Sequence, residues 1–238
     1  MLPKVIIGVV LLIGLFLLVG FFTHGRDEIF KGTPLENTSF QSQDKQTCPD
    51  PLVLQTPVDL DKVTGILYPG QERGGHFKYH GGFSFANSKY DEIEVRAPFD
   101  AKVTDGVHYI ETGRVQYMFD FETSCGIKYR FDHLAVLSSK FAEIAENLPE
   151  AKVDDSRTTS IRGDIQVTQG EVIATAVGYP ENPGVDFGVY ESKGFDPFHN
   201  FQKNAICWFD LLPASDSARV KNLLPSGPEG RTSTICRP

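Results

Sequence analysis

The sequence predicts a mainly antiparallel β domain behind an apolar N-terminal helix. Apolar and polar residues alternate with period two over residues 115–122 and again over 127–132, which is typical of half-buried strands. Residues 5–22 form an unbroken apolar run, which predicts a membrane-spanning helix. The chain has 238 residues, enough for one moderate domain with an anchor and tails, and it leaves room for one or two short helices.

The N-terminal 26 residues are expected to be a membrane anchor. An 18-residue apolar run makes a helix of about 27 Å, which just crosses a bilayer core. Lys4 precedes the run, and no clear cleavage site follows it, so an uncleaved signal anchor is favoured over a cleaved signal peptide. The domain is then expected on the extracytoplasmic side of a cell membrane.

Residues 27–57 are polar and rich in Gly, Pro, Ser and Asn, as expected for a tether. They contain a glycosylation sequon at Asn37. The formal net charge of the chain is −8, which argues against nucleic acid as a partner and leaves neutral or cationic ligands open.

The β domain is expected over residues 58–191. Val115, Tyr117, Phe119 and Phe121 should line one face of the first clear strand, and residues 124–126 should connect it to the next strand as a hairpin. The alternating aromatic residues are expected to form the core. A short helix should follow at about residues 139–148, since its apolar residues recur at helical spacing and Pro149 lies beyond its end. Residues 152–163 are expected to be a polar loop. Strands are expected at 165–177, broken at Gly170, and at 185–191.

Residues 192–238 are expected to be an extension that packs on the domain through its aromatic residues, with a helix near 215–224. The four cysteines, Cys48, Cys125, Cys207 and Cys236, include no Cys-x-x-Cys pair. Outside the cell an even number suggests disulfides, and three pairings are open. Cys207 with Cys236 is preferred because both lie in the extension.

Chemistry is concentrated in residues 76–84, where His76 and His80 are followed by Gly81-Gly82 and by Ser84. In an extended chain His76, His80 and Ser84 share one face, unless the glycines introduce a bulge. His24, His108 and His199 have no partner pattern and are assigned no role. No Gly-x-Ser-x-Gly nucleophile motif occurs, and Cys125 is expected to be bridged.

Four motifs occur in an order that resembles one known family. They are His80-x-Gly82, residues 95–106 (Val-Arg-Ala-Pro through Gly106), residues 129–134 with residues 167–174, and residues 185–191. Together they resemble the lysostaphin-type (LytM-like) zinc metallopeptidases over residues 76–191. The resemblance implies an antiparallel β sandwich or open barrel, the duplicated hybrid motif fold.

The resemblance also assigns roles to single residues. Active members hold zinc with the His and Asp of the first motif and the second His of the last, and two further histidines assist the bound water. By resemblance His80 keeps a ligand position and His133 keeps an assisting position. Ser84 replaces the Asp ligand, Gly188 replaces the His ligand, and Asp186 replaces the other assisting His.

These replacements imply an incomplete zinc site. Catalytic zinc needs three protein ligands and an open water position. Glycine has no side-chain ligand, and Asp186 points to the same face of its strand as Gly188, so it cannot simply take over. Without zinc the bound water is not activated, so we expect no metal, no cofactor and no catalysis. His133 and Asp186 are then only the family-equivalent positions of catalytic groups.

The favoured hypothesis is a non-catalytic binding or regulatory module at the cell envelope, a pseudoenzyme. Its ligand groove would have His80, Ser84, His133, Asp186 and Gly188 on its floor. The ligand would be an envelope glycan, a peptide or a partner protein.

Two alternatives stay open. The first is an active zinc-dependent peptidase or cell-wall hydrolase that uses the unusual ligand set His76, His80, His133 and Asp186. The second is a structural surface protein whose groove binds nothing.

Overall fold

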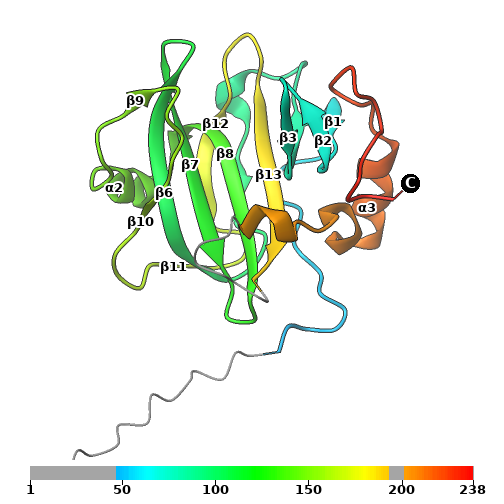
Figure 1. Ribbon diagram of the computed structural model, residues 1–238, viewed down its shortest axis with the longest axis horizontal. Helices are drawn as coiled ribbons and strands as arrows, with labels where there is room; N and C mark the ends of the chain where they lie inside the picture. Colours follow the sequence, from blue (N-terminus) through cyan, green and yellow to red (C-terminus); the bar gives the residue numbers. More distant parts are fainter. Residues whose placement is uncertain (1–46, 193–200, 238) are drawn as a thin grey trace, which may run out of the picture. The chain divides into compact units, whose positions relative to one another are not determined.

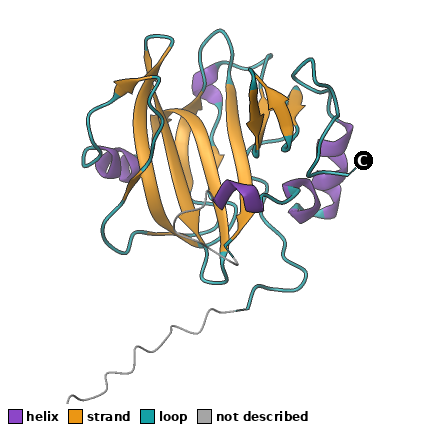
Figure 2. Ribbon diagram, viewed as in Figure 1, coloured by secondary structure: helices purple, strands orange, loops and turns teal. Residues whose placement is uncertain are grey.

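The computed structural model describes residues 47–192 and 201–237. The expected anchor at residues 1–26, the Asn37 sequon, most of the 27–57 tether and His199 lie outside these ranges. Within them, no helix has both the length and the apolar character needed to cross a membrane. The structure is mainly β with a few short helices, which confirms the expected fold class (Figures 1 and 2).

The described elements follow the chain in this order: β1 (Gly65–Leu67), β2 (Gln71–Arg73), β3 (His76–Lys78), β4 (Gly81–Ser84), η1 (Tyr90–Glu92), β5 (Val95–Arg96), β6 (Ala101–Glu111), β7 (Arg114–Glu122), β8 (Ile127–Leu137), α2 (Ser139–Ala145), β9 (Lys152–Val153), β10 (Thr159–Ser160), β11 (Gln166–Val167), β12 (Val172–Val177), β13 (Gly184–Glu191), η2 (Phe201–Asn204), η3 (Trp208–Leu211) and α3 (Ala214–Asn222). The main sheet has the order β1-β4-β13-β8-β7-β6-β10. β2 and β3 form a separate two-stranded sheet.

Strand β8 changes partner in the middle of its length. Its first half pairs with β13, ending at Asp132 opposite Asp186. Its second half pairs with β12, beginning at Leu134 opposite Val177. His133 stands between these two halves and has a positive φ of 62°. The change of partner therefore occurs at a residue that sequence analysis had placed in the groove.

The β7–β8 hairpin forms as expected, but one end of its alternation is wrong. Phe119, Phe121 and Phe131 are fully buried. Val115, in contrast, is 42% exposed, whereas Gln116 is only 1% exposed. The pairing of β7 with β8 shifts between Tyr117 and Phe119. The extra residue at this shift lies in β8, between Phe131 and Leu134, whereas β7 keeps a regular register with β6 over residues 114–120. Val115 is therefore on the same face as Phe119, but it lies near the turn to β6, where that face is open to solvent.

Residues 76–84 do not form one continuous strand, so the expected common face of His76, His80 and Ser84 is wrong. His76 lies in β3, within the two-stranded sheet, and its side chain is exposed. Ser84 lies in β4, within the main sheet. His80 stands between the two strands, where the chain bends.

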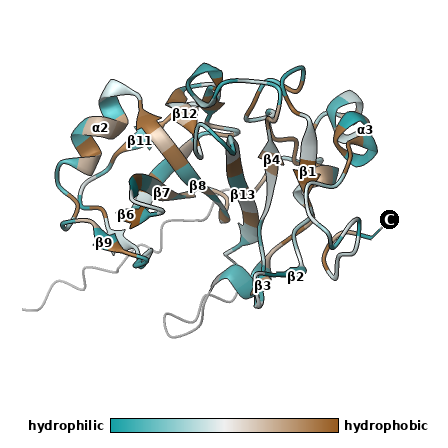
Figure 3. Cartoon of the chain, turned by 90° about the horizontal axis from the view of Figure 1, so that it is seen from above, coloured by the Kyte–Doolittle hydropathy of each residue, from teal (hydrophilic) through white to brown (hydrophobic). Residues whose placement is uncertain are grey.

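The remaining expected elements are largely present. α2 and α3 lie inside the predicted helical regions, and a break at Gly170 separates β11 from β12. The predicted polar loop at 152–163 contains two short strands, β9 and β10, that both pair with β6. Figure 3 shows that hydrophobic residues gather on the strands, whereas α3 is mainly hydrophilic.

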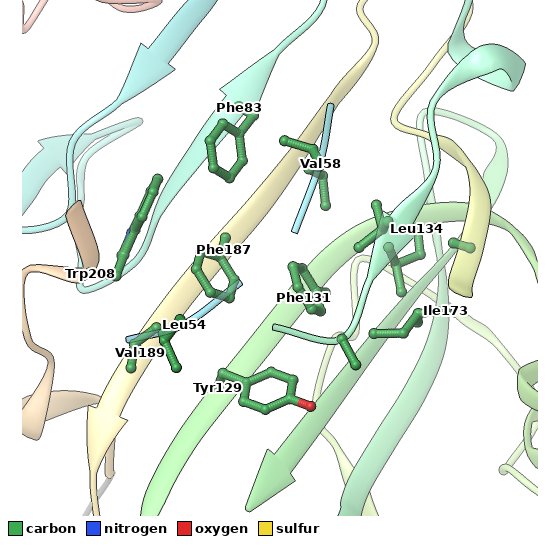
Figure 4. Close-up of a cluster of buried hydrophobic side chains, with 14 of the residues drawn as sticks. Leu54, Val58, Phe83, Tyr129, Phe131, Leu134, Ile173, Phe187, Val189 and Trp208 are labelled. Atoms are coloured by element: carbon green, nitrogen blue, oxygen red, sulfur yellow. The ribbon is translucent and has the colours of Figure 1, made fainter. Parts of the chain in front are cut away.

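One core joins the two ends of the described chain. Phe83, Phe131 and Phe187 pack between the strands, and Leu54 and Trp208 meet them from residues before β1 and after β13 (Figure 4). Trp208 is fully buried, and its ring centroid lies 5.1 Å from that of Phe187. Residues on both sides of the strand region therefore belong to the same folded unit.

Two disulfides close this unit. Cys207 pairs with Cys236, which confirms the preferred pairing, and Cys48 pairs with Cys125 in the β7–β8 turn. The first bond holds the C-terminal segment to η3, and the second holds the segment before β1 to the turn of the β7–β8 hairpin.

Candidate functional site

The centre of the candidate site is a contact between His80 and Asp186. Asp186 lies on β13 opposite Gly82 of β4, and its Oδ2 is 3.2 Å from Nδ1 of His80. A Cβ on Gly82 would lie 2.8 Å from Oδ1 of Asp186, closer than side-chain atoms normally approach. The glycine at position 82 thus leaves the space that the carboxylate occupies.

His133 approaches the same carboxylate from β8. Its Nε2 is 3.7 Å from Oδ2 of Asp186, and its Nδ1 is 3.3 Å from Oε2 of Glu111. Its backbone N–H donates to the Asp132 carboxylate at 2.7 Å. A positive φ is uncommon for a residue other than glycine, and here it aims the imidazole between two carboxylates.

Two tyrosines complete the wall beside His133. The hydroxyl of Tyr109 donates to Asp132 at 2.7 Å and lies 3.4 Å from Nδ1 of His133. The hydroxyl of Tyr179 donates to Glu111 at 2.5 Å. Tyr109 and Glu111 lie two residues apart on β6 and so share a face. The cluster is therefore built from β6, β8, β13 and the segment before β4.

Arg73 fixes the other side of the site. Its guanidinium donates to the backbone carbonyls of His80, at 3.0 Å, and of Tyr68, at 2.7 Å. These bonds hold the bend between β3 and β4, and therefore the position of the His80 ring. Burial lowers the pKa of Arg73, and the nearby Asp186 opposes that effect.

The charges of the cluster are set by burial and by its carboxylates. Burial lowers the pKa of His80, although Asp186 opposes it. Burial also acts to lower the pKa of His133, but Asp132, Asp186 and Glu111 together outweigh it, so that pKa is raised. Burial acts to raise the pKa of Asp186, yet the two histidines outweigh it and that pKa is lowered. The raised pKa makes His133 easier to protonate than His80, and the lowered pKa of Asp186 favours its ionised form.

The structure brings some of the expected floor residues together and leaves others apart. His80, His133 and Asp186 form one cluster, and Gly188 lies beside His80. Ser84 is opposite Gly184, two residues along the sheet from the pairing of Gly82 with Asp186. His76 is exposed at the start of β3, and among the described residues it makes no hydrogen bond or ion pair with the cluster.

The space beside Gly188 is already filled. A Cβ at this position would overlap the hydroxyl of Tyr190 and would lie 3.0 Å from the Cβ of His80. Tyr190 follows Gly188 on the same face of β13 and is fully buried. A side chain at position 188 would therefore have to displace Tyr190 or His80.

Over residues 47–192 and 201–237, no group of three or more His, Cys, Asp or Glu side chains is arranged to hold a metal. His80 and His133 carry nitrogen donors of the kind zinc prefers, but both face the same oxygen of Asp186.

Sequence analysis did not identify Arg73, Tyr109, Glu111 or Tyr179 as site residues. Glu111 contacts His133 because β6 and β8 both flank β7, an arrangement that a local pattern does not specify. The period-two spacing of Tyr109 and Glu111 could have shown that they share a face, but not which face.

Comparisons with known proteins give little beyond this geometry. No protein-family model matches the chain, and no curated protein matches it. A crystal structure of Helicobacter pylori Csd3 aligns with 71% of this chain at 15% sequence identity and a TM-score of 0.37. The chain spans 40% of the length of that structure. At this similarity the chemistry of the site has to be read from the chain's own residues.

Proposed function

We propose that this protein is a non-catalytic binding or regulatory module, held at the outer side of a cell membrane by residues 5–22. The observation that carries the proposal is the filled space at Gly188. There the Tyr190 hydroxyl and the Cβ of His80 occupy the position that a side-chain ligand would need. This packing supports the proposal, because a side chain at position 188 could reach the site only if Tyr190 or His80 moved.

Contacts within the cluster offset part of its negative charge. The Asp186 carboxylate faces the imidazoles of His80 and His133, and the Asp132 carboxylate accepts from Tyr109 and from the backbone of His133. Buried charges are tolerated when they are paired and hydrogen-bonded in this way. The former catalytic position then serves as a fixed polar floor.

Part of this floor is open to a ligand. The side chain of Glu111 is 38% exposed and that of His133 is 26% exposed, whereas Asp186 is 17% exposed. Carboxylate acceptors and imidazole donors at these positions suit the hydroxyl and amide groups of an envelope glycan or peptide, or of a partner protein. The acidic charge of the chain favours neutral or cationic ligands over anionic polymers.

The test uses the full chain, purified without a chelator and without a histidine tag. We expect less than stoichiometric zinc, even after incubation with added zinc. We also expect saturable co-sedimentation with insoluble cell-wall sacculi and no release of soluble fragments. His133→Ala should weaken the co-sedimentation, whereas His108→Ala, which changes a histidine outside the cluster, should leave it unchanged. If both variants co-sedimented equally well with sacculi, the cluster around His133 would not be part of the ligand-binding groove.

A second candidate function is an active zinc-dependent peptidase or cell-wall hydrolase. It is favoured by one observation, the approach of two imidazoles to the same Asp186 oxygen at 3.2 and 3.7 Å. This candidate requires stoichiometric zinc that is lost in His80→Ala, together with a hydrolytic activity lost in the same variant. That pair of results would replace the binding module with the enzyme.

A further inference from the structure

A separate groove lies between the end of α2 and the segment that contains β10. Its volume is about 600 Å³. Figure 1 shows α2 and β10 next to each other at the outer side of β6. The lining is slightly more apolar than polar. Its polar residues are Asn147, Thr159, Ser160 and Arg162, and its apolar residues are Ile144, Leu148, Pro149, Ile161 and Ile165.

Both walls of the groove are anchored to the domain. Ile144 is 7% exposed and belongs to the main core. The backbone N–H of Ile161 donates to the carbonyl of Thr104 at 2.8 Å. A Cβ on Gly106 would lie 3.0 Å from Cδ1 of Ile161. The absence of a side chain at position 106 therefore leaves the space in which Ile161 packs against β6. The groove therefore exists without a ligand to induce it.

Arg162 adds a cation to this lining. Its side chain is exposed and makes no ion pair or hydrogen bond with any described residue. The charged residues near it in the chain are engaged, since Arg157 pairs with Asp155 and Asp164 lies 3.5 Å from Lys102. The groove thus combines apolar walls with one guanidinium whose charge is not balanced locally.

We propose that this groove binds an anionic amphiphile, with its alkyl chain along the aliphatic lining and its carboxylate on Arg162. A volume of about 600 Å³ lies within the range of small-molecule sites, which is roughly 300–1,000 Å³. A guanidinium presents paired donors that match a carboxylate. The inference is independent of the function proposed for the His133 cluster, because it uses none of the same residues.

The two parts of the ligand make separate predictions. Each methylene buried in the groove should raise the affinity about fourfold, the ratio that corresponds to the transfer of one CH₂ from water. The charge on Arg162 acts at the surface, so removing it should weaken carboxylate binding only about two- to fivefold. It should not weaken the binding of an alcohol with the same chain.

The experiment is photo-labelling of the full chain in lipid nanodiscs. The probes are a 12-carbon carboxylate with a terminal diazirine and the corresponding alcohol, and labelled residues are located by mass spectrometry. We expect saturable labelling in residues 144–149 or 159–165, stronger for the carboxylate. Unlabelled carboxylates of 8, 10 and 12 carbons should compete with increasing affinity.

Three variants separate the contributions. Arg162→Gln should reduce labelling by the carboxylate and leave labelling by the alcohol unchanged. Arg157→Gln is the matched control on the same loop and should change neither. Leu148→Gln should reduce both.

The proposal is overturned by carboxylate and alcohol probes that label the wild-type groove equally, or by labelling confined to residues 5–22. It is also overturned by competition that does not depend on chain length. Because Arg162 is exposed, its variant should fold normally, and the comparison of the two probes does not depend on Leu148→Gln.

Discussion

His80 and Asp186 lie 3.2 Å apart at a point where the neighbouring strand offers only a glycine. Gly82 of β4 is the partner of Asp186, and any side chain there would meet the carboxylate. The pairing of an imidazole with a carboxylate thus depends on a third residue that contributes no side chain at all. This dependence can be tested directly.

Gly82→Ala should destabilise the protein by about 1–3 kcal/mol, the usual cost of forcing an extra methyl into a packed site. The new Cβ would lie 2.7 Å from the carbonyl of Val185 and 2.8 Å from Oδ1 of Asp186. Urea denaturation measures the change. Gly184→Ala is the control on the opposing strand, since its Cβ would lie 3.3 Å from its nearest neighbour and should cost less. Equal losses in the two variants would contradict the crowding argument.

The two histidines should titrate on opposite sides of an ordinary histidine, whose pKa is about 6.5. His80 should titrate below that value because of its burial, and His133 above it because of its three carboxylate neighbours. NMR titration of the imidazole protons measures both. His80→Gln and His133→Gln should each remove one of the two curves. If the two imidazoles titrated at the same pH, this prediction would be wrong, because burial of His80 and the carboxylates around His133 should separate their pKa values.

Together, these two histidines contribute most to the stability of the fold near pH 6.5. A pKa raised by folding, as at His133, gives stability that is present below about pH 6.5 and lost as the pH rises through the folded pKa. A pKa lowered by folding, as at His80, gives stability that is present above about pH 6.5 and lost as the pH falls through the folded pKa. In His133→Gln the loss on the alkaline side should disappear while the loss on the acidic side remains. Urea denaturation at several pH values measures this.

Two ion pairs with the same geometry should differ greatly in their effect on stability. Arg130 binds both oxygens of Asp120 at 2.6 Å, and Asp120 is 2% exposed. Arg157 binds both oxygens of Asp155 on an exposed loop. Arg130→Ala leaves a buried carboxylate without its partner and should cost about 3–5 kcal/mol. Arg157→Ala should leave the melting temperature unchanged, because water screens that pair.

Introducing an Asp at position 84 and a His at position 188, the ligands that the family resemblance implies, should not create a zinc site. In Ser84→Asp/Gly188→His the new imidazole would meet Tyr190 and His80. We expect the double variant to bind zinc no better than the wild type by equilibrium dialysis. Adding Tyr190→Ala removes the obstacle, so a gain of zinc in the triple variant alone would support the filled-space argument. Zinc binding by the double variant would contradict it.

The sequence was informative where burial is regular and uninformative where the sheet is interrupted. The alternation of Tyr129 and Phe131 predicted their burial correctly, because β8 is regular there. The same rule failed at Val115, which keeps its place in the alternation of β7 but lies near the turn to β6 and is exposed. His133 and Asp186 were placed in one groove only by resemblance to a family, and Glu111 was not placed there at all. Contacts between β6, β8 and β13 depend on strand order, which local patterns do not encode.

The Cys48–Cys125 bond determines how mechanical tension would pass through the molecule. It joins residues separated by 77 positions and links the segment before β1 to the turn between β7 and β8. A force applied to the chain before Cys48 would run across the sulfur bridge into that turn and bypass the residues in between. His80, Tyr109 and Glu111 all lie within the bypassed stretch. Pulling on the N-terminal side would thus load the turn of the β7–β8 hairpin and leave these parts of the groove unstrained.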